Sequence, residues 1–200
     1  MAEPLPDGET ARVHDLRAAL LEGFRWRSDP PQWPERRTSY ADYTRWWREP
    51  SILSGLGPAL AGLFPDAAPS IVMGPEARGS LLGPLVATHL GVGFAEVRKG
   101  ARRGSDDDQW LTRVTPPDYQ DRHVELAVRR GIVAPSDRVL FVDDWAAAGA
   151  QAIACQQLAE DAGAQWVGAA VIVDALENAS DRRQLNLRGF LHVRELEKLE

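Results

Sequence analysis

The strongest indication of the fold is the stretch Val139-Leu-Phe-Val-Asp-Asp-Trp-Ala-Ala-Ala-Gly-Ala-Gln151. Its first four residues are apolar with a β-branched Val at each end, which is typical of a buried strand. Two adjacent aspartates follow, then small residues that include Gly149, then a segment of helical character. A buried strand, an acidic tip, a small-residue loop and a helix N-terminus predict a ligand site at the carboxyl end of a strand in an open parallel α/β sheet.

The same stretch predicts the chemistry of the ligand. Backbone N–H groups of the small-residue loop and of the helix N-terminus favour an anion such as phosphate. The carboxylates of Asp143 and Asp144 can accept hydrogen bonds from vicinal hydroxyls. A phosphate beside a diol is the chemistry of a ribose 5-phosphate. Two alternatives stay open: an Asp-Asp pair can cap a helix, and a small-residue loop can be a tight turn with a steric role only.

The composition is that of a soluble globular domain. The chain has 200 residues, of which 44% are hydrophobic and 26% are charged, and this suffices for one domain with a sizeable core. The net charge of −6 argues against nucleic acid as the main partner. Basic residues cluster at Arg98, Lys99, Arg102 and Arg103, a pattern that suits a small polyanion better than a duplex.

The expected location is the cytoplasm. The single cysteine, Cys155, excludes an intrachain disulfide and fits a reducing compartment. We interpret it as a buried, inert thiol in the helix that follows the small-residue loop. No apolar run reaches the ~18 residues of a membrane-spanning helix, and the first residues lack the basic-then-apolar pattern of a signal peptide. We therefore expect no membrane partner.

Strands and helices are expected to alternate along the chain. The patterns predict helices over 10–25, 79–90 and 149–162, and a helical region over 40–64 that starts or restarts at Pro50. They predict strands over 70–73, 93–98, 124–128, 138–142, 166–173 and 189–193. Residues 26–39, rich in Pro and Arg, predict no regular element, and 99–119 is the least ordered-looking segment. This alternation predicts an α/β fold with a central, mostly parallel sheet flanked by helices.

Several local patterns resemble one enzyme family. The stretch 139–151 is similar to the phosphoribosyl pyrophosphate (PRPP) motif of type I phosphoribosyltransferases, in which an apolar strand and two acidic residues precede a loop with Gly. Gly74-Pro-Glu-Ala-Arg-Gly79 is similar to the Gly-Ile-Glu-Ala-Arg-Gly loop of the adenine phosphoribosyltransferases. Asp42-Tyr43-Thr44, followed by Glu49-Pro50, resembles their Asp-Ile-Thr and Asp-Pro stretch.

Two further matches follow in the expected order. Arg98-Lys99 matches the Arg-Lys pair that opens a loop in the adenine enzymes. Val124-Glu-Leu126, a short spacer and Arg138-Val-Leu-Phe-Val-Asp-Asp144 come next, as in that family. The chain is therefore identified as a member of the type I phosphoribosyltransferases, and within them it resembles the adenine enzymes most. The likeness covers nearly the whole chain from about residue 40 onward.

The resemblance implies a fold and a reaction. The fold would be a single phosphoribosyltransferase domain over 1–200, with an N-terminal hood, mainly 10–50, and a flexible lid loop, about 99–121. The reaction would transfer ribosyl 5-phosphate from PRPP to a nitrogen base, adenine-like or an altered heterocycle, with release of pyrophosphate. Members of this family commonly pair, so the resemblance also implies a homodimer.

The resemblance implies roles for the acidic pair and for the loop after it. Asp143 and Asp144 would hold the ribose 2- and 3-hydroxyls, directly or as ligands of Mg²⁺, which is the expected cofactor. The loop would wrap the 5-phosphate through backbone N–H groups. This PRPP-binding loop comprises Ala146, Ala147, Ala148, Gly149, Ala150 and Gln151.

The resemblance also implies a second anion-binding loop after the first core strand. This pyrophosphate loop comprises Glu76, Ala77, Arg78 and Gly79. Arg78 would bind the pyrophosphate, because a guanidinium forks onto phosphate oxygens better than an ammonium does. A solvated surface arginine is the alternative. Arg98 and Lys99 would add positive charge on the same side.

Base recognition and proton transfer are implied for the hood and the lid. Tyr40 falls where the adenine enzymes place an aromatic that stacks on the base, and Trp145 follows the acidic pair. The lid would close over bound substrate and exclude water; a plain insertion is the alternative. Gln120 stands where the adenine enzymes carry a lid glutamate, so Asp118 and Asp121 are the candidate catalytic acids and bases there.

The chain departs from the family in its phosphate loop. Ala148 and Gln151 stand where the family has hydroxyl side chains, and Ala150 where Gly is common. A hydrogen bond to a charged group contributes about 1.5–3 kcal/mol, so losing two would weaken PRPP binding about a hundredfold unless the Gln151 amide replaces one. Ala41 replaces an arginine typical of the hood. Two hypotheses remain: an active enzyme with an altered base pocket, or a catalytically silent regulatory relative that binds PRPP or a nucleotide.

Overall fold

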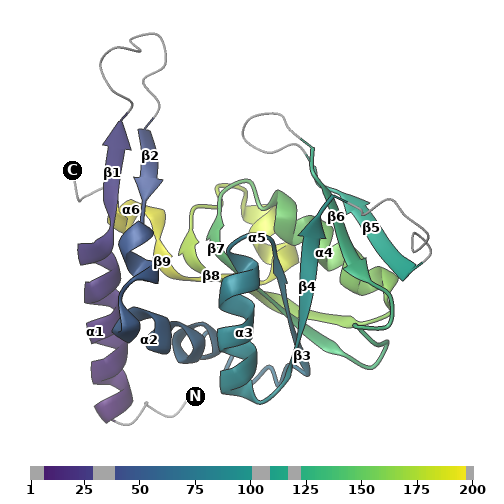
Figure 1. Cartoon of the computed structure of the whole chain (residues 1–200), viewed down its shortest axis with the longest axis horizontal. Coiled ribbons are helices and arrows are strands. Elements are labelled where there is room, and N and C mark those ends of the chain that lie inside the picture. The colour runs from purple at the N-terminus through teal and green to yellow at the C-terminus, as the bar shows by residue number, and fades with distance from the viewer. Residues whose placement is uncertain (1–6, 29–38, 101–108, 117–122, 197–200) are drawn as a thin grey trace.

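The computed structural model describes residues 7–28, 39–100, 109–116 and 123–196. A seven-stranded sheet forms the centre of this part of the chain (Figure 1). Its strands are β3 (Ile71–Pro75), β4 (Gly93–Lys99), β5 (Trp110–Val114), β6 (Glu125–Arg129), β7 (Arg138–Ala146), β8 (Gln165–Asp174) and β9 (Leu187–His192). They lie in the order β5-β6-β4-β3-β7-β8-β9.

The sheet is mostly parallel, as the sequence predicted. Strands β4, β3, β7, β8 and β9 pair in parallel. Only β6 and β5 run antiparallel, at the edge beyond β4. The prediction of an irregular 99–119 is wrong at β5. Its β-branched Thr112 and Val114 suit a strand, and the cross-strand partners on β6 stabilise a segment whose Gly-, Ser- and Asp-rich flanks indicated a loop.

Helices follow the parallel strands on both faces of the sheet (Figure 1). The helices are α1 (Asp7–Gly23), η1 (Thr44–Trp47, 3-10), α2 (Pro50–Ala61), α3 (Gly79–Leu90), α4 (Ala150–Asp161), α5 (Ala179–Leu185) and α6 (Val193–Leu196). Pro50 begins α2, where its fixed φ and missing N–H cost nothing. The structure confirms the predicted helix over 79–90. It adds α5, whose N-cap residue Asn178 accepts a hydrogen bond from Ser180 N through its side chain.

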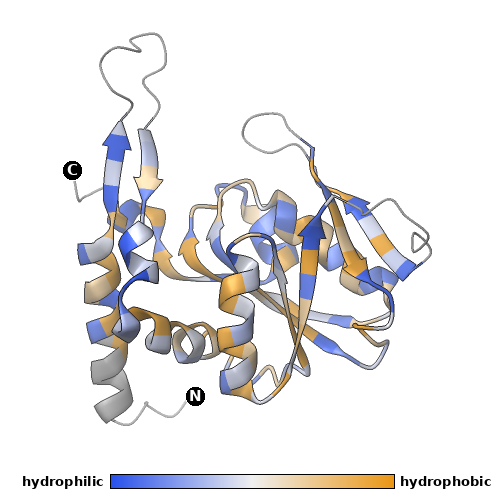
Figure 2. Cartoon of the chain, viewed as in Figure 1, coloured by the Kyte–Doolittle hydropathy of each residue, from blue (hydrophilic) through white to orange (hydrophobic). Residues whose placement is uncertain are grey.

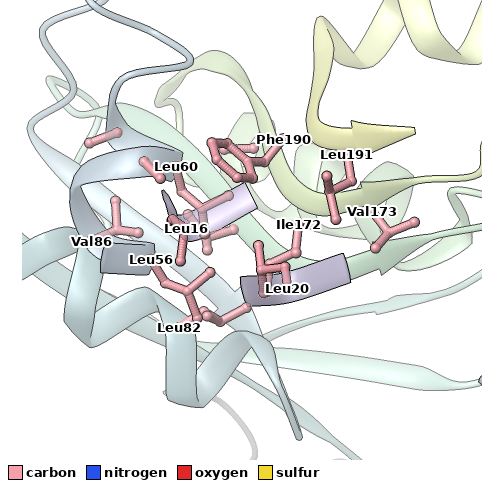
Figure 3. Close-up of a cluster of buried hydrophobic side chains, with 14 of the residues drawn as sticks. Leu16, Leu20, Leu56, Leu60, Leu82, Val86, Ile172, Val173, Phe190 and Leu191 are labelled. Carbon is pink, nitrogen blue, oxygen red and sulfur yellow. The ribbon is translucent and has the colours of Figure 1, made fainter. Parts of the chain in front are cut away.

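Strand β7 is buried on both faces. Leu140 and Val142 point into a core formed with α1, α2 and α3, whereas Val139 and Phe141 point into a second core that includes α4. Successive strand side chains point to opposite faces, so this apolar run fills both cores. Figure 3 shows the first core, in which side chains from α1, α2, α3, β8 and β9 converge. Hydrophobic residues accordingly concentrate in the central strands and in α2 and α3 (Figure 2).

The hood segment, 10–50, contains α1, η1 and a two-stranded antiparallel sheet. Its strands, β1 (Arg25–Ser28) and β2 (Ser39–Asp42), stand away from the central sheet and extend beyond the C-terminal end of α1 (Figure 1). The prediction that 26–39 holds no regular element is therefore wrong at 26–28 and at 39, and the predicted helical region over 40–64 is wrong at 40–42, because the pairing with β1 makes these residues a strand. Arg27 Nε lies 2.5 Å from Asp42 Oδ2 across this pair, a contact that joins residues far apart in sequence. No helix in the described ranges is long and apolar enough to cross a membrane.

Candidate functional site

The acidic pair lies within β7, not after it. We expected the strand to end at Val142, but its pairing with β8 continues as far as Ala146 opposite Asp174. The continued ladder fixes the backbone of both aspartates, because Asp143 pairs with Val171. Asp143 is only 6% exposed and Asp144 only 8%. Two carboxylates are thus held rigidly at the carboxyl end of the central strand, where ligands bind in open α/β sheets.

Asp143 is held on the α4 side of the sheet. Its Oδ1 accepts a hydrogen bond of 2.9 Å from the backbone N–H of Asp144. Burial raises the pKa of the Asp143 carboxyl, and the negative charge of Asp144 raises it further. Cys155 on α4 is fully buried, and its pKa is raised by burial and by the charge of Asp143. The predicted burial of this thiol is confirmed.

Replacing Asp143 with Asn should stabilise the fold at neutral and alkaline pH. The pKa of the Asp143 carboxyl is higher in the folded chain than in the unfolded chain, so the folded state binds its proton more tightly. The protonated carboxyl contributes its full stability below the pKa of the unfolded chain, and this contribution is lost as the pH rises through the pKa of the folded chain. An amide does not ionise, so we expect the difference in melting temperature between Asp143→Asn and the parent to grow from pH 5 to pH 8. Calorimetry in the presence of EDTA, without PRPP, measures this. A difference that shrinks with rising pH would contradict it.

Asp144 points to the opposite side, toward the hood. Its Oδ2 accepts a hydrogen bond of 2.9 Å from the hydroxyl of Tyr43. Arg78 Nε lies 3.8 Å from the same oxygen. Burial raises the pKa of the Tyr43 hydroxyl, and the charge of Asp144 adds to this effect, so Tyr43 stays protonated and donates. The structure therefore brings together Asp144 and Arg78, two of the predicted site residues, and adds Tyr43, which was not predicted.

The pyrophosphate loop is a tight connection between β3 and α3. A Cβ on Gly74 would lie 2.4 Å from Gly79 O, so only glycine allows this close approach. The loop is also tied to β4, because Glu76 Oε2 accepts from Lys99 N at 3.0 Å and Glu76 N donates to Val97 O at 2.8 Å. The peptide bond between Glu76 and Ala77 is cis. Glu76 thus anchors the loop to β4, and Arg78 is left beside Asp144.

The structure divides the predicted PRPP-binding loop, or phosphate loop, between three elements: Ala146 is the last residue of β7, 147–149 form the connection, and Ala150 and Gln151 begin α4. Gly149 has φ +71° and stands at the N-cap of α4, where a Cβ would lie 3.2 Å from Leu176 Cδ1. Ala147 and Ala148 are exposed, and Ala150 is buried in the first turn of α4. The Gln151 Oε1 atom is buried and finds no hydrogen-bond partner within the described residues. No described residue therefore occupies this oxygen, and a flip would interchange the O and N of the amide.

The two candidate base-binding aromatics lie in different surroundings. Tyr40 is 50% exposed on β2, opposite Arg27. Trp145 stacks on Tyr43, with ring centroids 6.1 Å apart and planes at 20°, and on Phe24 at 6.3 Å and 24°. Tyr43, rather than Tyr40, is the hood tyrosine that contacts the acidic pair. The signal for it was present in the sequence, because Tyr43 stands where the adenine enzymes have Ile in their Asp-Ile-Thr pattern.

The remaining candidates lie at the edge of the site or outside the described residues. Arg98 pairs with Glu96 at 2.9 Å on a half-exposed face of β4. The positive charge of Lys99 opposes the effect of burial on the pKa of Asp143, so Lys99 adds its charge on that side of the site. The candidate lid residues Asp118 and Asp121 and the nearby Gln120 lie outside the described residues, and their roles stay predictions.

Comparison with known proteins identifies the family. Residues 50–197 match the family model of the phosphoribosyl transferase domain. Adenine phosphoribosyltransferase of Paracidovorax citrulli is 34% identical over 155 residues, which are 76% of this chain and 82% of that protein. The chain belongs to the phosphoribosyltransferase family.

The solved structures agree with the fold. The adenine phosphoribosyltransferase of Rhodothermus marinus superposes with a TM-score of 0.71 at 28% identity, covering 92% of this chain and 99% of that one. The enzyme of Thermoanaerobacter pseudethanolicus gives 0.74 at 21% identity, covering 90% and 99%. The type I phosphoribosyltransferase fold is therefore confirmed. As a phosphoribosyltransferase, the chain transfers ribosyl 5-phosphate from PRPP to a nitrogen base and releases pyrophosphate.

The acidic pair of this phosphoribosyltransferase fits a hard cation. Within the described residues no group of three or more His, Cys, Asp or Glu side chains could enclose a metal ion. Mg²⁺, however, is usually held by one or two carboxylates together with substrate phosphates and water, at oxygen ligands only. Asp143 and Asp144 supply that number and kind of ligand. Any Mg²⁺ here would share its coordination sphere with PRPP.

Proposed function

We propose that this phosphoribosyltransferase uses adenine as its base and Mg²⁺ as its cofactor. One observation carries the proposal. Two buried carboxylates, an arginine and a small-residue loop at a helix N-terminus converge at the carboxyl end of β7. This set matches the ribose, pyrophosphate and 5-phosphate groups of PRPP one for one. The relative from Paracidovorax citrulli, by its name an adenine phosphoribosyltransferase, supports the choice of base.

Asp143 and Asp144 act on the sugar. They accept hydrogen bonds from the ribose 2- and 3-hydroxyls and orient the ring. When the bond from ribose C1 to pyrophosphate breaks, positive charge develops on the ring, and the nearby carboxylates stabilise it. Because the strand already holds these carboxylates in place, they need no rearrangement when the charge develops in the transition state. Mg²⁺, when bound, supplies positive charge to the PRPP oxygens.

Arg78 acts on the leaving group. The electron pair of the broken bond goes to pyrophosphate, whose added negative charge the guanidinium stabilises by hydrogen bonds to its oxygens. The N–H groups of the loop Ala146–Gln151 hold the 5-phosphate at the other end of the sugar. A ring nitrogen of adenine forms the new bond to C1 and loses its proton. Asp118 and Asp121 remain the candidates to accept it.

The proposal is tested by following both products with a panel of bases. The purified chain is incubated with PRPP and Mg²⁺ and with adenine, guanine, hypoxanthine or uracil. We expect AMP and pyrophosphate in equal amounts with adenine, and at least tenfold slower turnover with the other bases. Turnover with another base alone would overturn the choice of adenine and leave the reaction intact. PRPP binding by calorimetry, without turnover on any base, would favour the silent regulatory relative.

A further inference from the structure

Tyr43 reaches the acidic pair from the hood. It immediately precedes η1, and its hydroxyl donates to Asp144 Oδ2 at 2.9 Å across 101 positions of sequence. Its ring is fixed from two sides, by Trp46 with centroids 4.9 Å apart and by Trp145 at 6.1 Å. Because Trp46 is fully buried in the first core, Tyr43 is held on a rigid part of the hood.

The contact leaves one oxygen of Asp144 open to a ligand. Both Tyr43 and Arg78 approach Oδ2, and no described residue donates a hydrogen bond to Oδ1. A carboxylate offers about four lone-pair sites on its two oxygens, so a ribose hydroxyl can bind Oδ1 while Tyr43 keeps Oδ2. Tyr43 therefore fixes the rotation of the Asp144 carboxylate without competing for its ligand face.

The Tyr43 ring also supports Arg78. The guanidinium carbon lies 5.7 Å from the Tyr43 ring centroid and 5.4 Å from that of Trp47. Cations at this distance from aromatic faces are attracted by the ring quadrupole. Arg78 Nε is buried beside Asp144, whereas the Arg78 side chain as a whole stays 42% exposed. The rings thus hold the guanidinium in place and leave its N–H groups for an anion.

We propose that Tyr43 is a positioning residue for the reaction: its hydroxyl orients Asp144 toward the ribose, and its ring holds Arg78 toward the pyrophosphate. The inference rests on the proposed use of PRPP. The adenine enzymes that this chain resembles have Ile at this place in the Asp-Ile-Thr pattern, and an aliphatic side chain performs neither task. Tyr43 therefore joins the hood to both anionic halves of the PRPP site.

Two substitutions separate the hydroxyl from the ring. Tyr43→Phe removes only the hydroxyl, so we expect the KM for PRPP to rise about tenfold, in line with the loss of one hydrogen bond to a charged group. Its KM for adenine and its inhibition constant for pyrophosphate should change less than about twofold. Tyr43→Leu also removes the ring under Arg78, and the inhibition constant for pyrophosphate should then rise about threefold or more.

Trp26→Phe is the matched control in the hood. Trp26 Nε1 donates to Leu196 O at 3.1 Å, so this variant also loses one hydrogen bond of a hood aromatic. The structure, which describes all three side chains, shows no hydrogen bond, ion pair or ring contact of Trp26 with Asp144 or Arg78. The Trp26 ring does pack edge-on against Trp145 at 6.4 Å between centroids, and Phe keeps an aromatic ring there. We expect a lower melting temperature with an unchanged KM for PRPP. An equal rise of this KM in Trp26→Phe would overturn the proposal, since general damage to the hood would then explain both variants.

Direct binding keeps the inference separate from the proposed function. Calorimetric titration with PRPP and Mg²⁺ should give a dissociation constant about tenfold higher for Tyr43→Phe than for the parent. The two dissociation constants for PRPP can be compared even if the parent does not convert adenine. That result would overturn the proposed base or the proposed catalytic activity, but not the role of Tyr43 in binding PRPP. An unchanged dissociation constant for PRPP in folded Tyr43→Phe would contradict the positioning role. A lower dissociation constant would also contradict it, because it would show that the Tyr43 hydroxyl competes with PRPP for Asp144.

Discussion

Asp144→Asn is expected to lower kcat/KM for PRPP by about 10²–10³, the usual cost of removing one preorganised electrostatic group from a transition state. The amide keeps the shape of the carboxylate but loses the negative charge that faces the developing cation on ribose. It also loses the ion pair with Arg78, whose Nε lies 3.8 Å from Asp144 Oδ2. Steady-state release of pyrophosphate with adenine, at varied PRPP, measures the effect.

The control for this variant is Asp161→Asn. Asp161 pairs with Arg113 at 2.6 Å on the surface of α4, and solvent screens such an exposed pair, so it contributes little to stability. This variant removes the same charge from the chain, so it should leave kcat/KM within about twofold of the parent. If Asp144→Asn kept activity within tenfold of the parent, Asp144 would not stabilise the transition state, and Asp143 alone would have to carry that role.

The sequence predicted those parts of the site that lie close together in the chain. The strand, acidic pair, glycine and helix of 139–162 are consecutive, so periodicity and small-residue content were enough to locate β7 and α4. The loop 74–79 was located by its resemblance to the Gly-Ile-Glu-Ala-Arg-Gly loop of the adenine enzymes, and the structure shows why Gly74 is needed there, since a Cβ would lie 2.4 Å from Gly79 O. Local sequence encodes where such features lie, but the extension of β7 from Val142 to Ala146 depends on its pairing with β8.

What the sequence missed depends on partners far away in the chain. Strands β1 and β5 have four and five residues, and both are stabilised by cross-strand pairs with β2 and β6 rather than by their own pattern. Tyr43 falls near Asp144 only because the hood folds over the end of β7. The departure of Tyr43 from the family pattern is visible in the sequence, but its contact with Asp144 depends on the folded chain.

A second long-range feature lies beneath the phosphate loop. Asp174, 6% exposed at the end of β8, forms an ion pair with Arg182 of α5 and accepts from Leu176 N at 3.0 Å. Arg182 also donates to Leu176 O. This corner supports the loop at two points. Ala175 N donates to Ala146 O at 2.9 Å, and Leu176 packs against Gly149 at the N-cap of α4.

Arg182→Met should therefore destabilise the fold and weaken PRPP binding together. Removing one partner of a buried ion pair leaves an unpaired buried charge, here Asp174, at a cost of about 3–5 kcal/mol, and we expect the lower end because Arg182 is one-third exposed. At about 2–4 °C per kcal/mol for a chain of this size, the melting temperature should fall by about 10 °C. Calorimetry with and without PRPP and Mg²⁺ measures both effects.

Arg183→Met distinguishes the ion pair from the general effect of charge on α5. Arg183 follows Arg182 in the same helix and is exposed, so its replacement removes an equal charge without touching Asp174. Its melting temperature and PRPP affinity should match the parent. If Arg182→Met lost stability but bound PRPP as tightly as the parent, the corner would support the fold and not the loop. If Arg182→Met lowered both the melting temperature and the affinity for PRPP, and Arg183→Met lowered neither, the ion pair between Arg182 and Asp174 would be shown to maintain the conformation of the phosphate loop from outside the site.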